Sequence, residues 1–283
     1  MLKYIVLILF IIYIIYENHV FKVTRYHIES KKLKGLKEEI NIVVLADLHN
    51  HVYGKQNEKL IKAIEEEAPD IILIAGDMIV AKPRESMEVS IDLLQQLAKK
   101  YPIYYGMGNH EYRMKIYPEQ YVGMYEAYLK EIQHDNVIIL DNKSVRITIK
   151  GTTLNIHGLE IEKEYYKRFQ KAKLADDYLN ALLGNPNKEE YNILLAHNPE
   201  YFEAYAKWGA DMTLAGHIHG GLIRLPYLGG LASPQVEFFP KYDGGQFYEG
   251  ERTMILSRGL GTHTINIRVN NRAELISIRL SQK

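Results

Sequence analysis

The stretch Ile71-Ile72-Leu73-Ile74-Ala75-Gly76-Asp77 decides the fold of this chain of 283 residues. Four consecutive large aliphatic residues bounded by turn formers predict a strand that is buried on both faces, as in a sheet covered by helices. The glycine lets the chain turn sharply, and the aspartate then lies at the carboxyl end of the strand, where open α/β sheets bind their ligands. Asp77 is therefore a candidate functional carboxylate, and an ordinary turn-capping aspartate is the alternative.

The composition limits the chemistry that the chain can perform. Lysine plus arginine and aspartate plus glutamate both number 35, so no net charge favours nucleic acid as a partner. The chain has no cysteine, which excludes disulfides, thiolate metal sites and cysteine nucleophiles. Eleven histidines are present, several of them in short polar clusters, and they indicate that any metal is held by nitrogen and oxygen ligands.

The amino-terminal residues 1–21 are predicted to form a signal anchor, that is, a transmembrane helix that is not cleaved. Uncharged residues run from Tyr4 to Tyr16, and no small-residue cleavage site follows them. A cleaved signal peptide and a buried strand or helix are the alternatives. The anchor predicts a single-pass protein of the cell membrane with its folded domain outside the cytoplasm. Residues 22–39 are interpreted as a linker or edge strand, and residues 40–283 as one domain.

Polar side chains follow the predicted strands on either side of Asp77. The strand at 40–45 is followed by Asp47 and His49, whose spacing puts both side chains on one side of an extended segment. The strand at 103–107 is followed by an amide, an imidazole and a carboxylate, namely Asn109, His110 and Glu111. Predicted helices between the strands make the strands parallel, so all these groups are expected at one edge of the sheet.

Two later strands end in histidine. His197 follows the predicted strand at 191–196, and Gly216-His217-Ile218-His219-Gly220-Gly221 follows the strand at 211–215. The two histidines of this turn project together, between glycines that let the backbone approach an ion or a substrate. A solvent-exposed histidine turn is the alternative.

The middle of the chain is less informative. Apolar runs predict antiparallel strands at 137–140, 145–149 and 154–156. His157 is interpreted as a structural histidine or one that supports a ligand from behind, and residues 162–183 are predicted to be helical and to cover the sheet or flank the cleft.

Seven of these side chains are candidate metal ligands: Asp47, His49, Asp77, Asn109, His197, His217 and His219. Seven ligands are too many for one tetrahedral ion, but they suit two ions about 3.5–4 Å apart that share a carboxylate, for which Asp77 is the natural choice. Mixed histidine and carboxylate ligands favour manganese, iron or zinc, and leave the identity open. Two such ions orient a phosphate and activate a water, so the sequence predicts phosphoester hydrolysis.

The same motifs, in this order from Asp47 to His219, resemble those of the calcineurin-like metallophosphoesterase superfamily. The resemblance implies an α/β fold, a four-layer α/β/β/α sandwich with two mixed β-sheets. It implies one divalent ion bound by Asp47, His49, Asp77 and His219, and a second bound by Asp77, Asn109, His197 and His217. It also implies in-line attack by a hydroxide that bridges the ions. His110, next to Asn109, would protonate the leaving oxygen, and Glu111 would orient His110.

A narrower similarity concerns a bacterial membrane-associated branch of the superfamily. It rests on the amino-terminal segment, on Ser257-Arg258-Gly259-Leu260-Gly261 and on Ile267-Arg268. The branch includes phosphodiesterases and hydrolases of UDP-2,3-diacylglucosamine. We therefore expect a phosphodiesterase, with a pyrophosphatase of a nucleotide-linked lipid as the enzymatic alternative. A non-catalytic, metal-stabilised protein that binds membrane or cell wall is the alternative of another class. The expected partner is a lipid-linked or envelope-derived phosphoester, without nucleic acid or an obligate protein partner.

Overall fold

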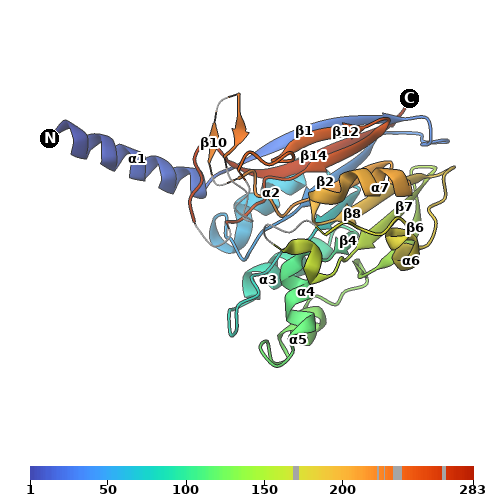
Figure 1. Cartoon of the computed structure of the whole chain (residues 1–283), viewed down its shortest axis with the longest axis horizontal. Coiled ribbons are helices and arrows are strands. Elements are labelled where there is room, and N and C mark those ends of the chain that lie inside the picture. Colours follow the sequence, from blue (N-terminus) through green and yellow to red (C-terminus); the bar gives the residue numbers. More distant parts are fainter. Residues whose placement is uncertain (168–171, 222, 226, 232–237, 263–265) are drawn as a thin grey trace.

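The computed structural model describes residues 1–167, 172–221, 223–225, 227–231, 238–262 and 266–283. Two six-stranded mixed sheets pack face to face, and helices cover both outer faces (Figure 1). The first sheet runs in the order β1 (Phe21–Ser30), β14 (Ala273–Gln282), β2 (Ile40–Leu45), β3 (Ile71–Ala75), β4 (Ile103–Gly106) and β5 (Val137–Leu140). The second runs in the order β12 (Gly245–Glu249), β13 (Arg252–Leu256), β9 (Met212–Ala215), β8 (Tyr191–Ala196), β7 (Thr152–Leu159) and β6 (Lys143–Ile149).

The helices and a small hairpin complete the described elements. The α-helices are α1 (Leu2–Asn18), α2 (Glu58–Glu66), α3 (Glu88–Ala98), α4 (Asn109–Ile116), α5 (Met124–Glu131), α6 (Tyr178–Leu183) and α7 (Phe202–Trp208). Short 3₁₀ turns lie at η1 (Lys55–Asn57), η2 (Lys163–Tyr166) and η3 (Pro199–Tyr201). Strands β10 (Arg224–Leu225) and β11 (Gly229–Gly230) pair with each other.

Strand β3 shows why the sheets form layers. Its residues Ile72 and Ile74 pack in a core with apolar residues of α2 and α3. Ile71 and Leu73 point the other way and pack between the sheets with residues of β7, β8 and β9. Every residue of β3 is buried, which confirms the predicted strand buried on both faces. The prediction of two mixed sheets is also confirmed.

Parallel pairing brings the ends of the predicted strands together. Strand β3 lies between β2 and β4, parallel to both, and β8 lies parallel to β9 in the second sheet. The residues that follow β2, β3 and β4 therefore leave the first sheet in one direction, and those that follow β8 and β9 leave the second sheet in one direction. Ligand atoms from both sheets lie within 4.8 Å of one another, so the two sets of strand ends meet at one edge. This edge of the sandwich holds the candidate site.

Helix α1 occupies the segment for which a membrane-spanning helix is predicted. It has 17 residues and rises about 26 Å, which is less than a hydrocarbon core of roughly 30 Å. Within the described residues no helix combines the length and the apolar character needed to cross a membrane. The transmembrane prediction is therefore not supported.

The carboxyl end of α1 is fixed to the domain, although the helix projects from it (Figure 1). The Arg272 guanidinium donates to the Glu17 carboxylate at 2.8 Å, and Asn18 Nδ2 donates to the Asn266 carbonyl at 2.8 Å. Both partners belong to the segment before β14. The position of the helix is thus linked to the carboxyl-terminal part of the domain.

The helix predicted over 162–183 is wrong for most of the described part of that range. The structure has the turn η2 and the six-residue helix α6, while residues 172–177 are not helical and 168–171 lie outside the described residues. Among the described residues of this range, the buried aliphatic side chains are those of Leu174 and Leu179. Five residues apart, they would lie about 140° apart around a helix, so a single helix could not bury both against the sheet.

Candidate metal centre

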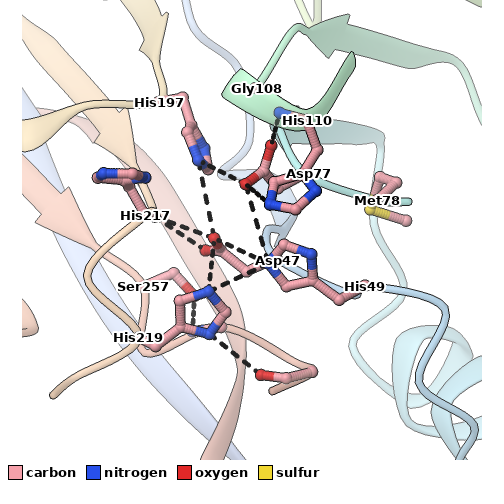
Figure 2. Close-up of polar contacts among 12 residues, drawn as sticks. Asp47, His49, Asp77, Met78, Gly108, His110, His197, His217, His219 and Ser257 are labelled. Carbon is pink, nitrogen blue, oxygen red and sulfur yellow. Dashed lines mark hydrogen bonds and ion pairs between the residues drawn. The ribbon is translucent and has the colours of Figure 1, made fainter. Parts of the chain in front are cut away.

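All seven predicted ligands lie just beyond the carboxyl ends of strands, and Figure 2 shows several of their side chains converging. Asp47 and His49 follow β2, Asp77 follows β3, Asn109 begins α4 after β4, His197 follows β8, and His217 and His219 follow β9. Both sheets thus contribute. His157, in contrast, lies in β7 with its ring nitrogens near Ser144 Oγ and Asn192 Oδ1.

Three groups of side chains bring ligand atoms within 4.8 Å of one another. The groups are Asp47 with His49 and His219, Asp77 with His197 and His217, and His49 with Asp77 and His110. The first two groups correspond to the two ion sites that the sequence resemblance implies, apart from Asn109 and the shared use of Asp77.

Asp77 belongs to two of these groups. Its Oδ2 atom is 3.1 Å from His197 Nε2, 3.8 Å from His49 Nε2 and 4.0 Å from His110 Nε2. Its other oxygen, Oδ1, accepts a hydrogen bond from the His110 backbone N–H at 2.8 Å. The backbone thus fixes the carboxylate with one oxygen directed at three imidazoles, which is the position that a bridging ligand needs.

Backbone carbonyls set the tautomers of three candidate ligands. The Nδ1 atoms of these histidines contact carbonyl oxygens, His49 that of Ile79 (3.3 Å), His197 that of Ala75 (2.7 Å) and His219 that of Gly261 (3.1 Å). A carbonyl only accepts, so each Nδ1 donates, and in the neutral ring each Nε2 has the lone pair that an ion needs. This is the arrangement that metal-binding histidines adopt.

A buried amide oxygen also fits a bound cation. Asn109 Oδ1 has no hydrogen-bond partner among the described residues. A buried polar atom without a partner costs about 1–3 kcal/mol. In addition, His49 Nε2 and His219 Nε2 lie 3.1 Å apart. Divalent ions would satisfy the amide oxygen and bind the imidazole nitrogens, so the donor set fits a metal centre.

His110 differs from the other histidines of the site. Its Nδ1 accepts a hydrogen bond from the Ala81 backbone N–H at 2.8 Å. In the neutral ring the proton is therefore on Nε2, which faces the Asp77 carboxylate (Figure 2). His110 is thus arranged as a hydrogen-bond donor toward the centre and not as a metal ligand.

Glu111 has a different role from the one that the resemblance implies. Its carboxylate accepts from the backbone N–H groups of Asp77 (3.0 Å), Met78 (2.9 Å) and Gly108 (3.0 Å), and from the Tyr105 hydroxyl (2.7 Å). Neighbouring side chains of a helix point about 100° apart, so Glu111 faces these backbones while His110 faces the site. The group that hydrogen-bonds the His110 ring is the Ala81 amide. Glu111 thus clamps the ends of β3 and β4 together.

Replacing Glu111 by glutamine is expected to lower the free energy of unfolding by about 1–3 kcal/mol, because the amide NH₂ would leave a buried backbone N–H unpaired. Urea denaturation in EDTA measures this loss without a contribution from bound ions. The control is Glu203→Gln, since the exposed Glu203 carboxylate pairs with Lys241 at the surface and its loss should leave the urea midpoint unchanged. If Glu111→Gln and Glu203→Gln had the same urea midpoint, Glu111 would not hold β3 and β4 together as described.

The backbone is strained at most of the ligands. Positive φ angles occur at Asp47 (51°), His49 (47°), Asp77 (55°), His217 (72°) and His219 (53°). Residues other than glycine rarely adopt this conformation, and it persists where the surrounding structure enforces it. Its concentration in five candidate ligands is typical of a functional site.

Burial and neighbouring charges shift the pKa values of three ligands before any ion binds. Burial raises the pKa of Asp47 to about 7. Burial also opposes charge on Asp77 and His197, but their attraction at 3.1 Å holds the pKa of Asp77 well below its usual range and raises that of His197 to about 10. An arriving ion must therefore displace a proton from His197, and below about pH 7 another from Asp47.

Metal binding is consequently expected to strengthen as the pH rises from 6 to 8. Each released proton contributes up to about tenfold in Kd per pH unit, with the tighter binding at the higher pH. Titration calorimetry with Mn²⁺ in two buffers of different ionisation enthalpy would measure both Kd and the number of protons released. A Kd that does not change between pH 6 and pH 8, with no proton release, would contradict this account of the site.

Tyr166 is a neighbour of the site that the sequence analysis did not identify. Its ring contacts that of His217 edge-on, with centroids 5.1 Å apart, and lies 6.5 Å from that of His197. Burial raises the pKa of its hydroxyl above the usual value, so the phenol is neutral. The surrounding stretch is charged and has no motif, and no sequence signal distinguishes this tyrosine from its neighbours.

Comparison with known proteins agrees with the geometry. Residues 40–221 match the family model described as calcineurin-like phosphoesterase. The chain is 26% identical over 255 residues to the uncharacterized metallophosphoesterase YkoQ of Bacillus subtilis, which covers 90% of this chain and 88% of YkoQ. It is 25% identical over 245 residues to the phosphodiesterase YaeI of Escherichia coli, which covers 84% of this chain and 81% of YaeI.

A solved structure shares the fold. A Staphylococcus aureus protein assigned as a 5′-nucleotidase superposes with a TM-score of 0.50 and 14% identity. The superposition covers 78% of this chain but only 49% of the other, so this chain spans about half of that protein. At this identity the likeness concerns the fold alone.

Proposed function

The chain belongs to the calcineurin-like phosphoesterase family and is a metal-dependent phosphoester hydrolase, and from this premise we propose that it is a phosphodiesterase with two divalent ions. The observation that carries the proposal is the pair of neighbouring ligand groups, Asp47 with His49 and His219 and Asp77 with His197 and His217, each with its ligand atoms within 4.8 Å. The similarity to the phosphodiesterase YaeI favours a diester as the substrate.

The proposed ligand sets follow the two groups. Asp47, His49, Asp77 and His219 would hold one ion, and Asp77, Asn109, His197 and His217 the other. Nitrogen and oxygen ligands of this kind suit manganese, iron or zinc. When bound, two such ions supply positive charge for the phosphoryl oxygens and lower the pKa of a water.

His110 is the proposed catalytic side chain. The Ala81 amide holds its ring so that the Nε2 proton faces the centre, where it would donate to a phosphoryl oxygen or to the leaving oxygen. The His110 backbone N–H meanwhile holds the Asp77 carboxylate. Asn109 precedes it on the first turn of α4, so one helix start supplies both a ligand amide and a proton donor.

The test compares two esters on the full-length protein. After treatment with EDTA and addition of Mn²⁺, kcat/KM is measured for bis-p-nitrophenyl phosphate and for p-nitrophenyl phosphate. The proposal expects the diester to be preferred by about tenfold or more. Preference for the monoester would overturn the diester assignment. Failure to cleave either ester with Mn²⁺, Fe²⁺ or Zn²⁺, despite metal binding, would instead favour the non-catalytic binding protein.

We also propose that α1 attaches the protein to a membrane surface. Large apolar side chains are exposed on every side of the helix, as Leu7 (54%), Ile8 (56%), Leu9 (60%) and Phe10 (48%) illustrate. A helix that is apolar all round is typical of a segment covered by lipid or protein. Attachment at the outer face of the cell membrane would favour a lipid-linked or envelope-derived phosphoester.

Flotation with phospholipid vesicles tests the attachment. The full-length protein is expected to float, and Leu7→Glu to remain at the bottom of the gradient. Val122→Glu is the matched control, because Val122 is 81% exposed on the domain itself. Flotation of Leu7→Glu at the wild-type level would contradict the proposal. Protection of the domain from protease added to intact cells would contradict the outward orientation.

A further inference from the structure

The segment before β14 contains two buried polar residues that the proposed chemistry does not use. Arg268 and Asn271 are 2% and 1% exposed. A buried guanidinium carries a large desolvation cost, which hydrogen bonds must offset. The contacts of these two side chains lead to the turn that carries His217 and His219.

Asn271 holds the backbone of this turn. Its Nδ2 donates to the carbonyl of His219 at 2.7 Å and to the carbonyl of Gly221. A methyl group on Gly220 would lie only 2.2 Å from Asn271 Oδ1, so the turn runs directly against this side chain. One amide thus fixes the backbone on both sides of Gly220.

Arg268 holds the carbonyl that orients a ligand ring. Its guanidinium donates to the carbonyls of Arg258 (3.0 Å), Gly259 (3.1 Å), Gly261 (2.6 Å) and Asn271 (2.9 Å). The Gly261 carbonyl also accepts from His219 Nδ1 at 3.1 Å. The opposite nitrogen of that ring, Nε2, lies 3.3 Å from Asp47 Oδ1. A chain of contacts therefore runs from the guanidinium through Gly261 to the ligand atom of His219.

We propose that Arg268 and Asn271 are positioning residues for the metal-binding turn, and that they fix His219 for the ion through Gly261 and the backbone of residues 219–221. The inference rests on the proposed metal-dependent function. Hydrogen-bond partners behind a ligand typically contribute 10–100-fold to metal affinity. The two residues come from a segment that lies about fifty residues after the turn in the sequence and contributes no ligand itself.

The test measures metal binding separately from hydrolysis. Full-length Asn271→Ala and Arg268→Lys are expected to raise the Kd for Mn²⁺ by about 10–100-fold in calorimetry. Saturating Mn²⁺ is expected to restore most of kcat, because neither residue is a proposed ligand or the proposed proton donor. The electron paramagnetic resonance spectrum of bound Mn²⁺ should also change.

Asn192 provides a matched control. It is also a fully buried asparagine, and its Nδ2 donates to two carbonyls, those of Asn187 (2.8 Å) and Glu190 (2.9 Å), at the opposite end of β8 from His197. Asn192→Ala should lose stability in EDTA to a similar extent as Asn271→Ala but keep the wild-type Kd for Mn²⁺. If Asn271→Ala does not fold, Asn271→Ser is used in its place.

The outcomes separate this inference from the proposed function. A wild-type Kd in the folded Asn271 and Arg268 variants, or an equal rise in Kd for Asn192→Ala, would overturn the positioning role. If the wild-type protein binds Mn²⁺ but cleaves neither ester, the proposed function fails, and the comparison of Kd values still decides the positioning role.

Discussion

Replacing Asp77 by asparagine is expected to lower kcat/KM for the diester by a factor on the order of 10³ or more, the scale of losing a central electrostatic group. Asparagine preserves the shape of the side chain, and its remaining oxygen can still accept from the His110 backbone N–H. The amide nitrogen would replace Oδ2, the atom that faces three imidazoles, and it has no lone pair for an ion.

Calorimetry and kinetics together check this expectation. The number of Mn²⁺ ions bound per chain should fall in Asp77→Asn, because the bridging oxygen contributes to both sites. Asp176→Asn is the control, since the exposed Asp176 carboxylate pairs with Lys207 at the surface and its loss should change neither quantity. Activity within about tenfold of the wild type would show that Asp77 does not bridge the ions.

Replacing His110 by asparagine is expected to lower kcat by about 10²–10⁴-fold, the usual contribution of a positioned proton donor. The asparagine oxygen lies near the position of Nδ1 and can still accept from the Ala81 N–H, so the variant removes mainly the Nε2 proton. The Kd for Mn²⁺ should remain close to the wild-type value, because His110 is expected to contact the substrate and not the ions.

His134 supplies the control for this substitution. It is an exposed histidine whose Nδ1 also accepts from a backbone N–H, that of Asn136 at 3.0 Å. His134→Asn should change neither kcat nor Kd. His110 lies in one ligand group with His49 and Asp77. A rise in Kd for Mn²⁺ of more than about tenfold in His110→Asn would therefore show that it binds an ion.

The sequence predicts the strands of the site well for a physical reason. Strands buried on both faces must be continuous apolar runs, so polar residues such as Asp47 or Asp77 become visible as soon as a strand ends. Parallel pairing then determines which ends lie together. The candidate ligands could thus be named from local patterns, although the pattern does not state which ion each one would bind.

The rest of the site depends on contacts that local patterns do not contain. The role of Glu111 follows from the direction of one helix turn relative to the backbones of β3 and β4. Asn271 contacts a turn about fifty residues earlier in the sequence, and Arg268 reaches the same turn only through the Gly261 carbonyl, which His219 also contacts. Nothing in either segment indicates its partner. Tyr166 lies in a stretch whose charged residues predict a helix that the described residues largely lack.

The topology of the first sheet affects how the protein is made. Strand β14 lies between β1 and β2 and pairs with β1 along Phe21–Ser30. During synthesis on the ribosome, β1 therefore has no neighbour until residues 273–282 have emerged, and the edge of β2 also stays open. Nascent chains stalled before residue 273 should be cut readily by protease within β1. One of the first strands to be made thus waits for the last strand of the chain before it can join the sheet.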